Sequence, residues 1–319
     1  GVFLSGGMDS GAITALASQS LNRPLRTFTI GFDNWPADER DLAALTARQW
    51  KTDHEVRLIS VEDLIGDLSE ALSSMDQPTM DGINSWYVSR EAKASGLTVA
   101  LSGLGGDELF AGYPSFRYIP ILKKVPHSLP LIKRVIPSSF RGSGSDFWRK
   151  FLAYIVGDLP YDHPYFAVRA LFPESQIRSL MSASLKHQDI WSSSSMQKWI
   201  SKLESILKSA ASLDRVAEVS WLELNQYMLS TLLRDADTMS MAHSLGVRVP
   251  FLDHSLVENV LRVPGILKIQ PNKQKPLLAR TVSGLLPTEV IDGRKMAFTF
   301  PFESWLKESL ADEISQELI

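Results

Sequence analysis

The stretch Gly1–Ser10, GVFLSGGMDS, decides how the rest of this sequence is interpreted. Its first half, Val2–Ser5, is a short apolar run typical of a buried β-strand. After Asp9 the apolar residues recur at helical spacing, at Ile13, Leu16, Ala17 and Leu21. The sequence therefore predicts a strand that turns through two glycines directly into a helix.

The turn itself has the features of an anion-binding loop. Gly6 and Gly7 let the backbone turn tightly and direct several N–H groups into one concavity. Ser5 and Ser10 add hydroxyl donors, and the helix N-terminus adds partial positive charge. Asp9 suits a phosphate or pyrophosphate site if Mg²⁺ bridges its carboxylate to the phosphates. The chain has no G-x-x-x-x-G-K-[ST] loop, and the plainer alternative is an ordinary capping turn.

Strand and helix signals alternate over the first hundred residues. Further strands are expected at Leu25–Phe32, Asp53–Ile59 and Leu97–Leu101. Helices are expected at Glu39–Trp50, at Val61–Leu72 with Ser60 as N-cap, and at Ser85–Ala94. This alternation predicts an α/β fold, a parallel sheet with right-handed crossovers and flanking helices. Ligands in such folds bind at the carboxyl ends of the strands.

After Tyr113 the pattern becomes mainly helical. Helices are expected at Phe147–Val156, Pro173–Met181, Gln197–Ala211, Val216–Leu233 and Ala236–Leu245. We therefore expect an α/β nucleotide-binding part, 1–115, followed by a mainly helical part, 116–319. The chain starts within a strand pattern and stops within a helical one, so we interpret it as a fragment of a longer protein.

Composition excludes several classes of function. The 319 residues are 44% apolar and 22% charged, as in ordinary globular proteins, and the net charge of −3 leaves no basic excess for nucleic acid. With no cysteine, this chain has no disulfide, thiolate zinc site or cysteine nucleophile. Its six histidines lack metal-ligand spacing. No apolar run is long enough for a membrane span and no signal peptide is visible, so we expect a cytoplasmic protein without a membrane partner.

Three further stretches carry a resemblance to a known family. They are Leu101–Tyr113 (LSGLGGDELFAGY), Met239–Asp253 (MSMAHSLGVRVPFLD) and Arg294–Phe298 (RKMAF), the last followed by Pro301 and Trp305. Together with SGGMDS they resemble the synthetase domain of the glutamine-hydrolysing asparagine synthetases, a branch of the PP-loop ATP pyrophosphatases. The resemblance runs in family order over essentially the whole chain, and it extends to the β-lactam synthetases.

The resemblance implies a reaction. Members of this family use ATP and Mg²⁺ to activate a carboxylate as an acyl-adenylate, release pyrophosphate, and let ammonia displace AMP. Aspartate or another carboxylate is then the expected substrate, with ammonia from glutamine. The glutaminase domain of such enzymes carries a terminal cysteine nucleophile, and this chain has neither, which fits a truncated chain. A homodimer is the assembly that we expect.

The same resemblance assigns candidate residues. Ser5, Gly6, Gly7 and Ser10 would hold pyrophosphate, and Asp9 and Asp107 would bind Mg²⁺ and act in catalysis. Lys295 would be the catalytic counter-charge to the departing pyrophosphate. The alternatives are a helix N-cap for Asp107 and a solvated surface lysine for Lys295.

Other residues have two open interpretations. Leu4, Ile30, Ser102 and Gly103 match the family's ATP-contact positions, but Leu4 and Ile30 also suit core packing. Arg248 would pair either with a substrate anion or, structurally, with Asp237 or Asp253. We interpret four more residues as core, namely Met239, Met241, Trp86 and Tyr87.

Two positions depart from the family pattern, since Leu104 and Gly246 stand where its members commonly have glutamate. These changes leave ATP activation intact and open the question of the acceptor chemistry. Asparagine formation is the favoured reaction. The main alternative is the same adenylation of another carboxylate, in an amidotransferase or lactam-forming enzyme. A tRNA-modifying PP-loop enzyme and a non-catalytic relative are weaker alternatives.

Overall fold

The computed structural model describes residues 1–32, 35, 38–79, 81–126, 146–181, 192–293, 301 and 305. The chain divides into two compact units. The first combines Gly1–Gly112 with Met228–Ile319, and the second is Tyr113–Tyr227. The chain thus leaves the first unit and returns to it. No helix in the described ranges is long and apolar enough to cross a membrane.

A parallel five-stranded sheet forms the centre of the first unit. Its strands lie in the order β3-β2-β1-β4-β5. Their bounds are β1 Val2–Phe3, β2 Arg26–Gly31, β3 Asp53–Leu58, β4 Val99–Leu101 and β5 Gly246–Arg248. The first four confirm the predicted strands and the α/β fold class. The fifth was not predicted, because Gly246–Arg248 lies in the mainly helical part of the sequence and lacks a longer apolar run around it.

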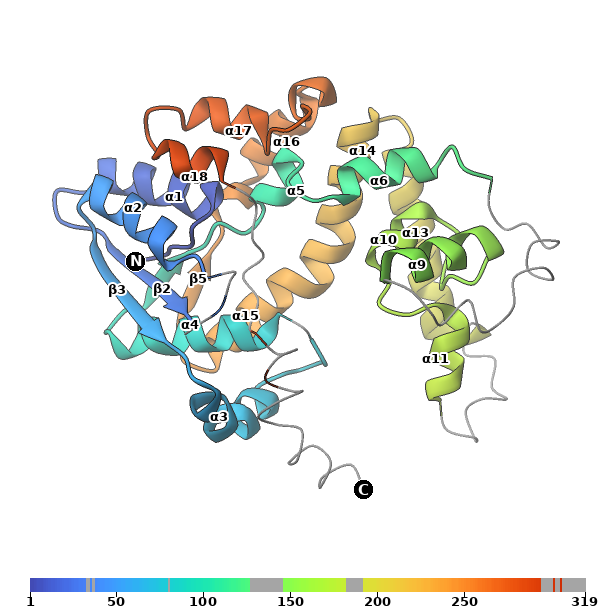
Figure 1. The fold of residues 1–319 in the computed structure, drawn as a ribbon. Coiled ribbons are helices and arrows are strands. Elements are labelled where there is room, and N and C mark those ends of the chain that lie inside the picture. Colours follow the sequence, from blue (N-terminus) through green and yellow to red (C-terminus); the bar gives the residue numbers. More distant parts are fainter. Residues whose placement is uncertain are drawn as a thin grey trace. The chain divides into compact units, whose positions relative to one another are not determined.

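Helices cover both faces of this sheet (Figure 1). On one face α1 (Met8–Gln19) and α2 (Arg40–Trp50) pack together, joined by α18 (Thr288–Asp292). On the other face α4 (Gly82–Ala94) packs against α15 (Leu233–Met241) and α3 (Val61–Ser73). The remaining elements are α5 (Gly106–Phe110), the single turns Pro250–Leu252 and Gly265–Leu267, α16 (His254–Arg262) and α17 (Pro276–Thr281).

Helix α3 shows how local sequence sets an element's start. The Ser60 hydroxyl accepts a hydrogen bond from the Asp63 N–H, and the Asp63 carboxylate accepts one from the Ser60 N–H. This reciprocal capping box satisfies two backbone donors that the helix itself leaves unpaired. The predicted N-cap is confirmed.

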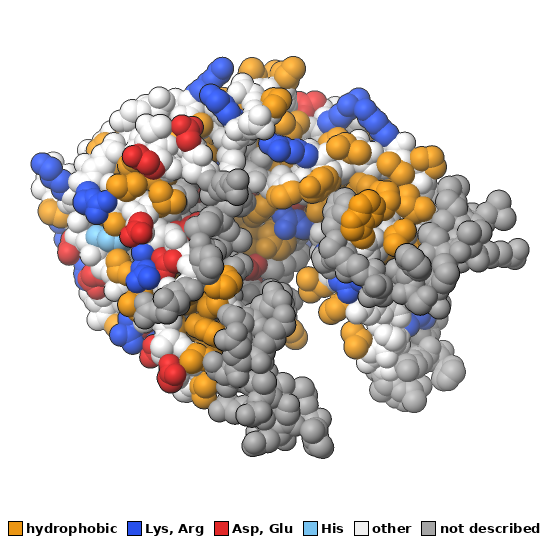
Figure 2. All heavy atoms as spheres, in the orientation of Figure 1, with side chains coloured by type: hydrophobic (Ala, Val, Ile, Leu, Met, Phe, Trp, Pro, Cys, Tyr) orange, Lys and Arg blue, Asp and Glu red, His pale blue; other side chains and the backbone are white. Residues whose placement is uncertain are grey.

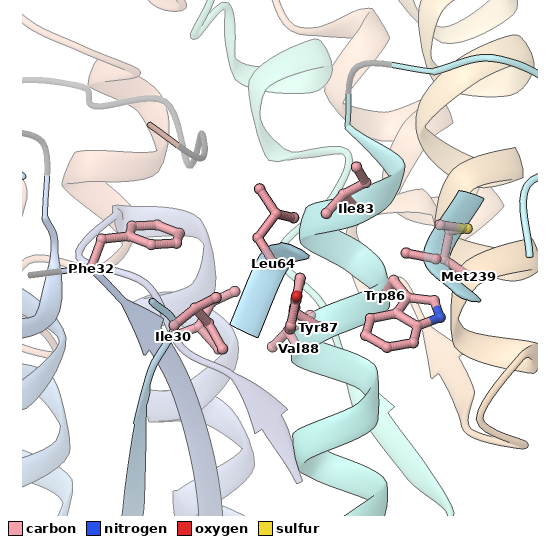
Figure 3. Close-up of a cluster of buried hydrophobic side chains, with 10 residues drawn as sticks. Ile30, Phe32, Leu64, Ile83, Trp86, Tyr87, Val88 and Met239 are labelled. Carbon is pink, nitrogen blue, oxygen red and sulfur yellow. The ribbon is translucent and has the colours of Figure 1, made fainter. Parts of the chain in front are cut away.

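The α4 side of the sheet holds a buried apolar cluster (Figure 3). Ile30 lies in β2, and Phe32 follows this strand directly. They belong to one cluster with Trp86 and Tyr87 of α4 and with Met239 of α15. Both aromatic rings and Met239 are at most 1% exposed, so the prediction that they are core residues is confirmed. The same prediction is wrong for Met241, which is 55% exposed. Two residues along an α-helix turn the side chain by about 200°, away from the face that Met239 buries.

The second unit is helical. It contains α6 (Ser115–Leu122), α9 (Asp146–Val156), α10 (Pro164–Arg169), α11 (Glu174–Leu180), α13 (Ser194–Ala210) and α14 (Arg215–Glu223). After α14 the chain continues as a π-helix, Leu224–Leu232, where a single α-helix to Leu233 was predicted. Figure 2 shows hydrophobic side chains gathered on the surface of this unit, and Ile121 and Trp148 are among the exposed ones.

An ion pair lies in the interior of the second unit. Glu223 is fully buried, and both of its carboxylate oxygens accept from the Arg169 Nε, at 2.9 and 3.1 Å. Ser115 and Tyr165 donate hydroxyl hydrogen bonds to the same carboxylate, at 2.5 and 3.3 Å. The Arg169 guanidinium also lies 4.0 Å from the centre of the Tyr227 ring. Burial and the neighbouring Glu223 charge raise the pKa of Tyr165 well above its usual value, so this hydroxyl stays a donor.

Replacing Glu223 by glutamine is expected to destabilise the protein by about 3 kcal/mol, because Arg169 keeps its charge without the buried carboxylate. Glu218→Gln on the same helix breaks the Lys123–Glu218 pair, whose lysine and glutamate are 36% and 12% exposed, and should cost less, about 1 kcal/mol. Urea unfolding of both variants measures the difference. Equal losses would contradict the importance given to burial.

Candidate active site

The predicted anion loop lies between β1 and α1, as expected. The hydroxyls of Ser5 and Ser10 are 2.9 Å apart, and the Ser5 N–H donates to the Ser10 hydroxyl at 3.0 Å. The Gly7 N–H donates to the Ser5 hydroxyl at 3.3 Å. Helix α1 begins at Met8, with Gly7 in an extended conformation at its N-cap. The two serines therefore brace the loop in the described structure.

One amide of the loop already holds an anion. The Gly6 N–H donates to a carboxylate oxygen of Glu39 at 3.1 Å. A Cβ on Gly6 would lie 2.8 Å from the Cβ of Leu42, so only glycine lets the start of α2 approach this closely. Sequence reasoning missed Glu39, which it treated only as the first residue of a helix. Its contact indicates that the loop amide is aimed at negatively charged oxygen.

The two predicted metal carboxylates meet at one point. Asp9 is the second residue of α1, and Asp107 is the second residue of α5, which follows β4. The ammonium of Lys275 is paired with both: it lies 2.6 Å from Asp107 Oδ1 and in direct contact with Asp9 Oδ2. The carboxylate side chains are only 18% and 19% exposed, and the lysine side chain only 5%. Parallel strands end at one edge of the sheet, which is why residues so distant in sequence converge here.

Lys275 was also missed by sequence reasoning. Its one signal is its position directly before Pro276, at the start of α17, and nothing in the sequence connects it with Asp9. Burial alone would lower the pKa of the Lys275 ammonium, but the charges of Asp9 and Asp107 outweigh burial and raise this pKa above its usual value. The lysine is therefore charged at neutral pH.

Three glycines after β4 make room for this cluster. A Cβ on Gly103 would lie 2.8 Å from the Ser10 nitrogen, and a Cβ on Gly106 would lie 2.4 Å from the Asp9 carboxylate. A Cβ on Gly112 would lie 1.8 Å from Asp107 Oδ1. None of these distances is compatible with a side chain, which gives the glycine-rich segment Leu101–Tyr113 a steric reason.

The donor set fits Mg²⁺. Carboxylate oxygens are ligands that Mg²⁺ prefers, and it is commonly held by one or two of them together with waters and substrate phosphates. Asp9 and Asp107 already converge on a single cation, the Lys275 ammonium. In the described part of the chain no group of three or more His, Cys, Asp or Glu residues is placed to hold a metal. Phosphates and water would have to complete the coordination.

The expected ATP-contact positions lie near the same edge but on different faces. Leu4 packs with Ala43 and Ala47 of α2, whereas Ile30 belongs to the α4-side cluster. The two side chains therefore lie on opposite faces of the sheet. Ser102 follows β4, where its N–H donates to the Arg248 carbonyl at 2.8 Å and its hydroxyl accepts from the Leu104 N–H at 3.3 Å.

The remaining candidate residues have different outcomes. Lys295 lies outside the described residues. Asp253 caps α16, accepting from the Ser255 and Leu256 N–H groups at 3.0 and 3.3 Å. Arg248 is exposed and donates to the Val247 carbonyl, and within the described ranges it forms no ion pair. The structural ion pair with Asp253 or Asp237 is thus not found there.

The two departures from the expected pattern occupy different places. Leu104 follows β4 directly, in the loop that carries Gly103 and Gly106. Gly246 is the first residue of β5 and pairs with Val99, at the opposite end of the strand from the site. A Cβ at Gly246 would come no closer than 3.4 Å to another group, the Arg248 guanidinium. Packing therefore does not require glycine at this position.

Comparison with known proteins gives one consistent result. A family model described as asparagine synthase matches residues 1–318. The chain is 30% identical to a glutamine-hydrolysing asparagine synthetase 1 of Bacillus subtilis, over 97% of this chain and 48% of that protein. It is 27% identical to asparagine synthetase 3 of the same organism, over 93% and 44%. An amidase of Penicillium rubens is 25% identical, over 99% and 51%. The chain spans about half the length of the curated relatives it matches.

Proposed function

Because the chain belongs to the asparagine synthase family, we propose that it is the ATP-using part of an amide-forming ligase. The observation that supports this most directly is the buried cluster of Asp9, Asp107 and Lys275 beside an anion-binding loop. A domain that had lost its chemistry would have no physical reason to keep two mostly buried carboxylates there.

The proposed reaction has two steps. A substrate carboxylate oxygen attacks the α-phosphorus of ATP, the bond from that phosphorus to the bridging oxygen breaks, and pyrophosphate leaves. Ammonia then attacks the carbonyl carbon of the acyl-adenylate, loses a proton, and AMP leaves with the bonding electron pair. The nucleophile and leaving group change in the second step, but the activated carboxyl carbon remains in place.

The chain's own residues have distinct tasks in this proposal. The amides of Gly6 and Gly7 hold the leaving pyrophosphate, after Glu39 gives up the Gly6 N–H. Asp9 and Asp107 hold Mg²⁺, which when bound neutralises phosphate charge and polarises the phosphoryl oxygens. Lys295 supplies a further counter-charge to pyrophosphate.

Aspartate is the leading acyl substrate, since the asparagine synthetases of Bacillus subtilis are among the relatives. A larger or less charged carboxylate is the rival, because the apolar Leu104 lies in the loop beside the site. The family match over nearly the whole chain favours amide synthesis over tRNA modification. Glutamine as the ammonia source is proposed for the complete protein.

Pyrophosphate exchange into ATP tests this proposal in the complete gene product. Exchange should require Mg²⁺ and a carboxylic acid, and ammonium chloride should then yield AMP and an amide detectable by mass spectrometry. Aspartate-dependent exchange with asparagine formation would exclude the rival substrate. Exchange with another acid but none with aspartate would exclude asparagine, and no exchange with any acid would contradict the ligase proposal.

A further inference from the structure

We propose that Lys275 is an internal counter-cation that competes with Mg²⁺ for Asp9 and Asp107, so that metal binding is an exchange of cations. In the metal-free protein the ammonium compensates half of the charge of the two carboxylates. When Mg²⁺ binds with nucleotide, the ammonium gives up carboxylate oxygens and becomes available to the phosphates. This inference rests on the proposed function, because it requires that the carboxylate pair is the metal site.

The geometry makes the competition direct. The ammonium contacts one oxygen of each carboxylate, Oδ2 of Asp9 and Oδ1 of Asp107. A metal ion held by both residues needs oxygens of this same pair, and two cations sharing them would repel each other at short range. Two carboxylates and one ammonium also leave a net charge of −1, which attracts a cation only weakly compared with a bare pair.

The position of Lys275 is built into the backbone. Its φ of 41° lies in the left-handed region, which is uncommon for a residue with a side chain. Pro276 follows directly, and a proline favours an extended conformation for the residue before it. Gly112 leaves space for the lysine stem, since a Cβ there would lie 2.4 Å from Lys275 Cε. A surface lysine would need none of these arrangements.

The exchange would link metal binding to nucleotide binding. Mg²⁺ alone must displace the ammonium within a nearly closed site, where Lys275 is only 5% exposed. Mg²⁺ arriving with ATP brings phosphates that accept the displaced ammonium. The wild-type protein should therefore bind Mg²⁺ weakly by itself, and removal of the lysine charge should strengthen that binding.

Thermal unfolding and calorimetric titration with Mg²⁺ alone provide the test in the complete protein. Lys275→Met should lower the unfolding midpoint in chelator, and added Mg²⁺ should recover most of this loss. Its Mg²⁺ affinity should be at least about tenfold higher than that of the wild type, since one unit of positive charge leaves the site. Lys273→Met, an exposed lysine two residues away, is the matched control and should behave as wild type.

Each other outcome overturns the exchange. An unchanged midpoint of Lys275→Met in chelator, or equal Mg²⁺ affinities of variant and wild type, would show that Lys275 does not compete. If Lys275→Met does not fold, Lys275→Gln makes the same comparison, because its amide is uncharged but can still donate hydrogen bonds. Suppose that Mg²⁺ with nucleotide raises the unfolding midpoint of the wild type, whereas Mg²⁺ alone shifts the midpoints of the wild type and Lys275→Met equally. This result would contradict the exchange but not the metal site. If Mg²⁺ stabilises neither protein even with nucleotide, the proposed metal site fails as well.

Discussion

Asp107→Asn and Asp9→Asn are each expected to reduce Mg²⁺-dependent pyrophosphate release by at least about 10²-fold while leaving the fold intact. Each substitution removes one of the two carboxylates that converge on a single cation. Stability should change less than activity, because the Lys275 ammonium keeps the other carboxylate as a partner. Release of pyrophosphate measures the first effect, and circular dichroism with thermal unfolding measures the second.

Asp41→Asn is the control for this pair. Asp41 is exposed in the first turn of α2, so the same chemical change there removes a charge without touching the cluster. Its pyrophosphate release should stay within about twofold of wild type. Near-wild-type turnover in either cluster variant would show that the metal role assigned to that residue is wrong.

Gly112→Ala is expected to cause a comparable loss of activity by displacing groups instead of removing them. The new Cβ would lie 1.8 Å from Asp107 Oδ1 and 2.4 Å from Lys275 Cε, so both groups must move. Displacements of about 1 Å at a catalytic group cost roughly 10²-fold in rate. The backbone of Gly112 is not in the left-handed region, so alanine adds contact and not conformational strain.

Gly66→Ala makes the same change in open space. Its Cβ would meet nothing within 4 Å, and it lies inside α3, where alanine should stabilise the helix by about 0.5–1 kcal/mol. Its activity should match wild type. Wild-type pyrophosphate release in Gly112→Ala would mean that the position of the Asp107 carboxylate is not important for the reaction.

The anion loop shows how far sequence reasoning reaches. Gly6 and Gly7 between a strand and a helix are a local pattern, and the structure has that loop between β1 and α1. Its hydrogen bonds could not be predicted in the same way. Ser5 and Ser10 were expected to add hydroxyl donors to an anion site, and in the structure these hydroxyls bond each other and the loop backbone. Glu39 reaches Gly6 only because α2 packs against the loop.

The glycines after β4 can be noticed in the sequence, but only the structure explains them. The segment Leu101–Tyr113 was conspicuous in the sequence and carried part of the family resemblance. The reason for its glycines depends on residues elsewhere in the chain, since Gly103 and Gly106 face Asp9 and Ser10 of α1. A pattern can mark such a position, but only the neighbouring atoms explain it.

By itself the sequence determined the four strands from Val2 to Leu101, the helices between them and the Gly6–Gly7 turn, because periodicity and turn residues act over short distances. The family followed from the resemblance of its motifs. Only the tertiary structure decided that the chain returns after Tyr227 to add β5 beside β4. It also decided that Lys275 meets Asp9 across 266 residues. Such a contact follows from the packing of α17 beside α5, which itself follows β4, and from the charge that buried carboxylates require. Neither leaves a periodic trace in the sequence.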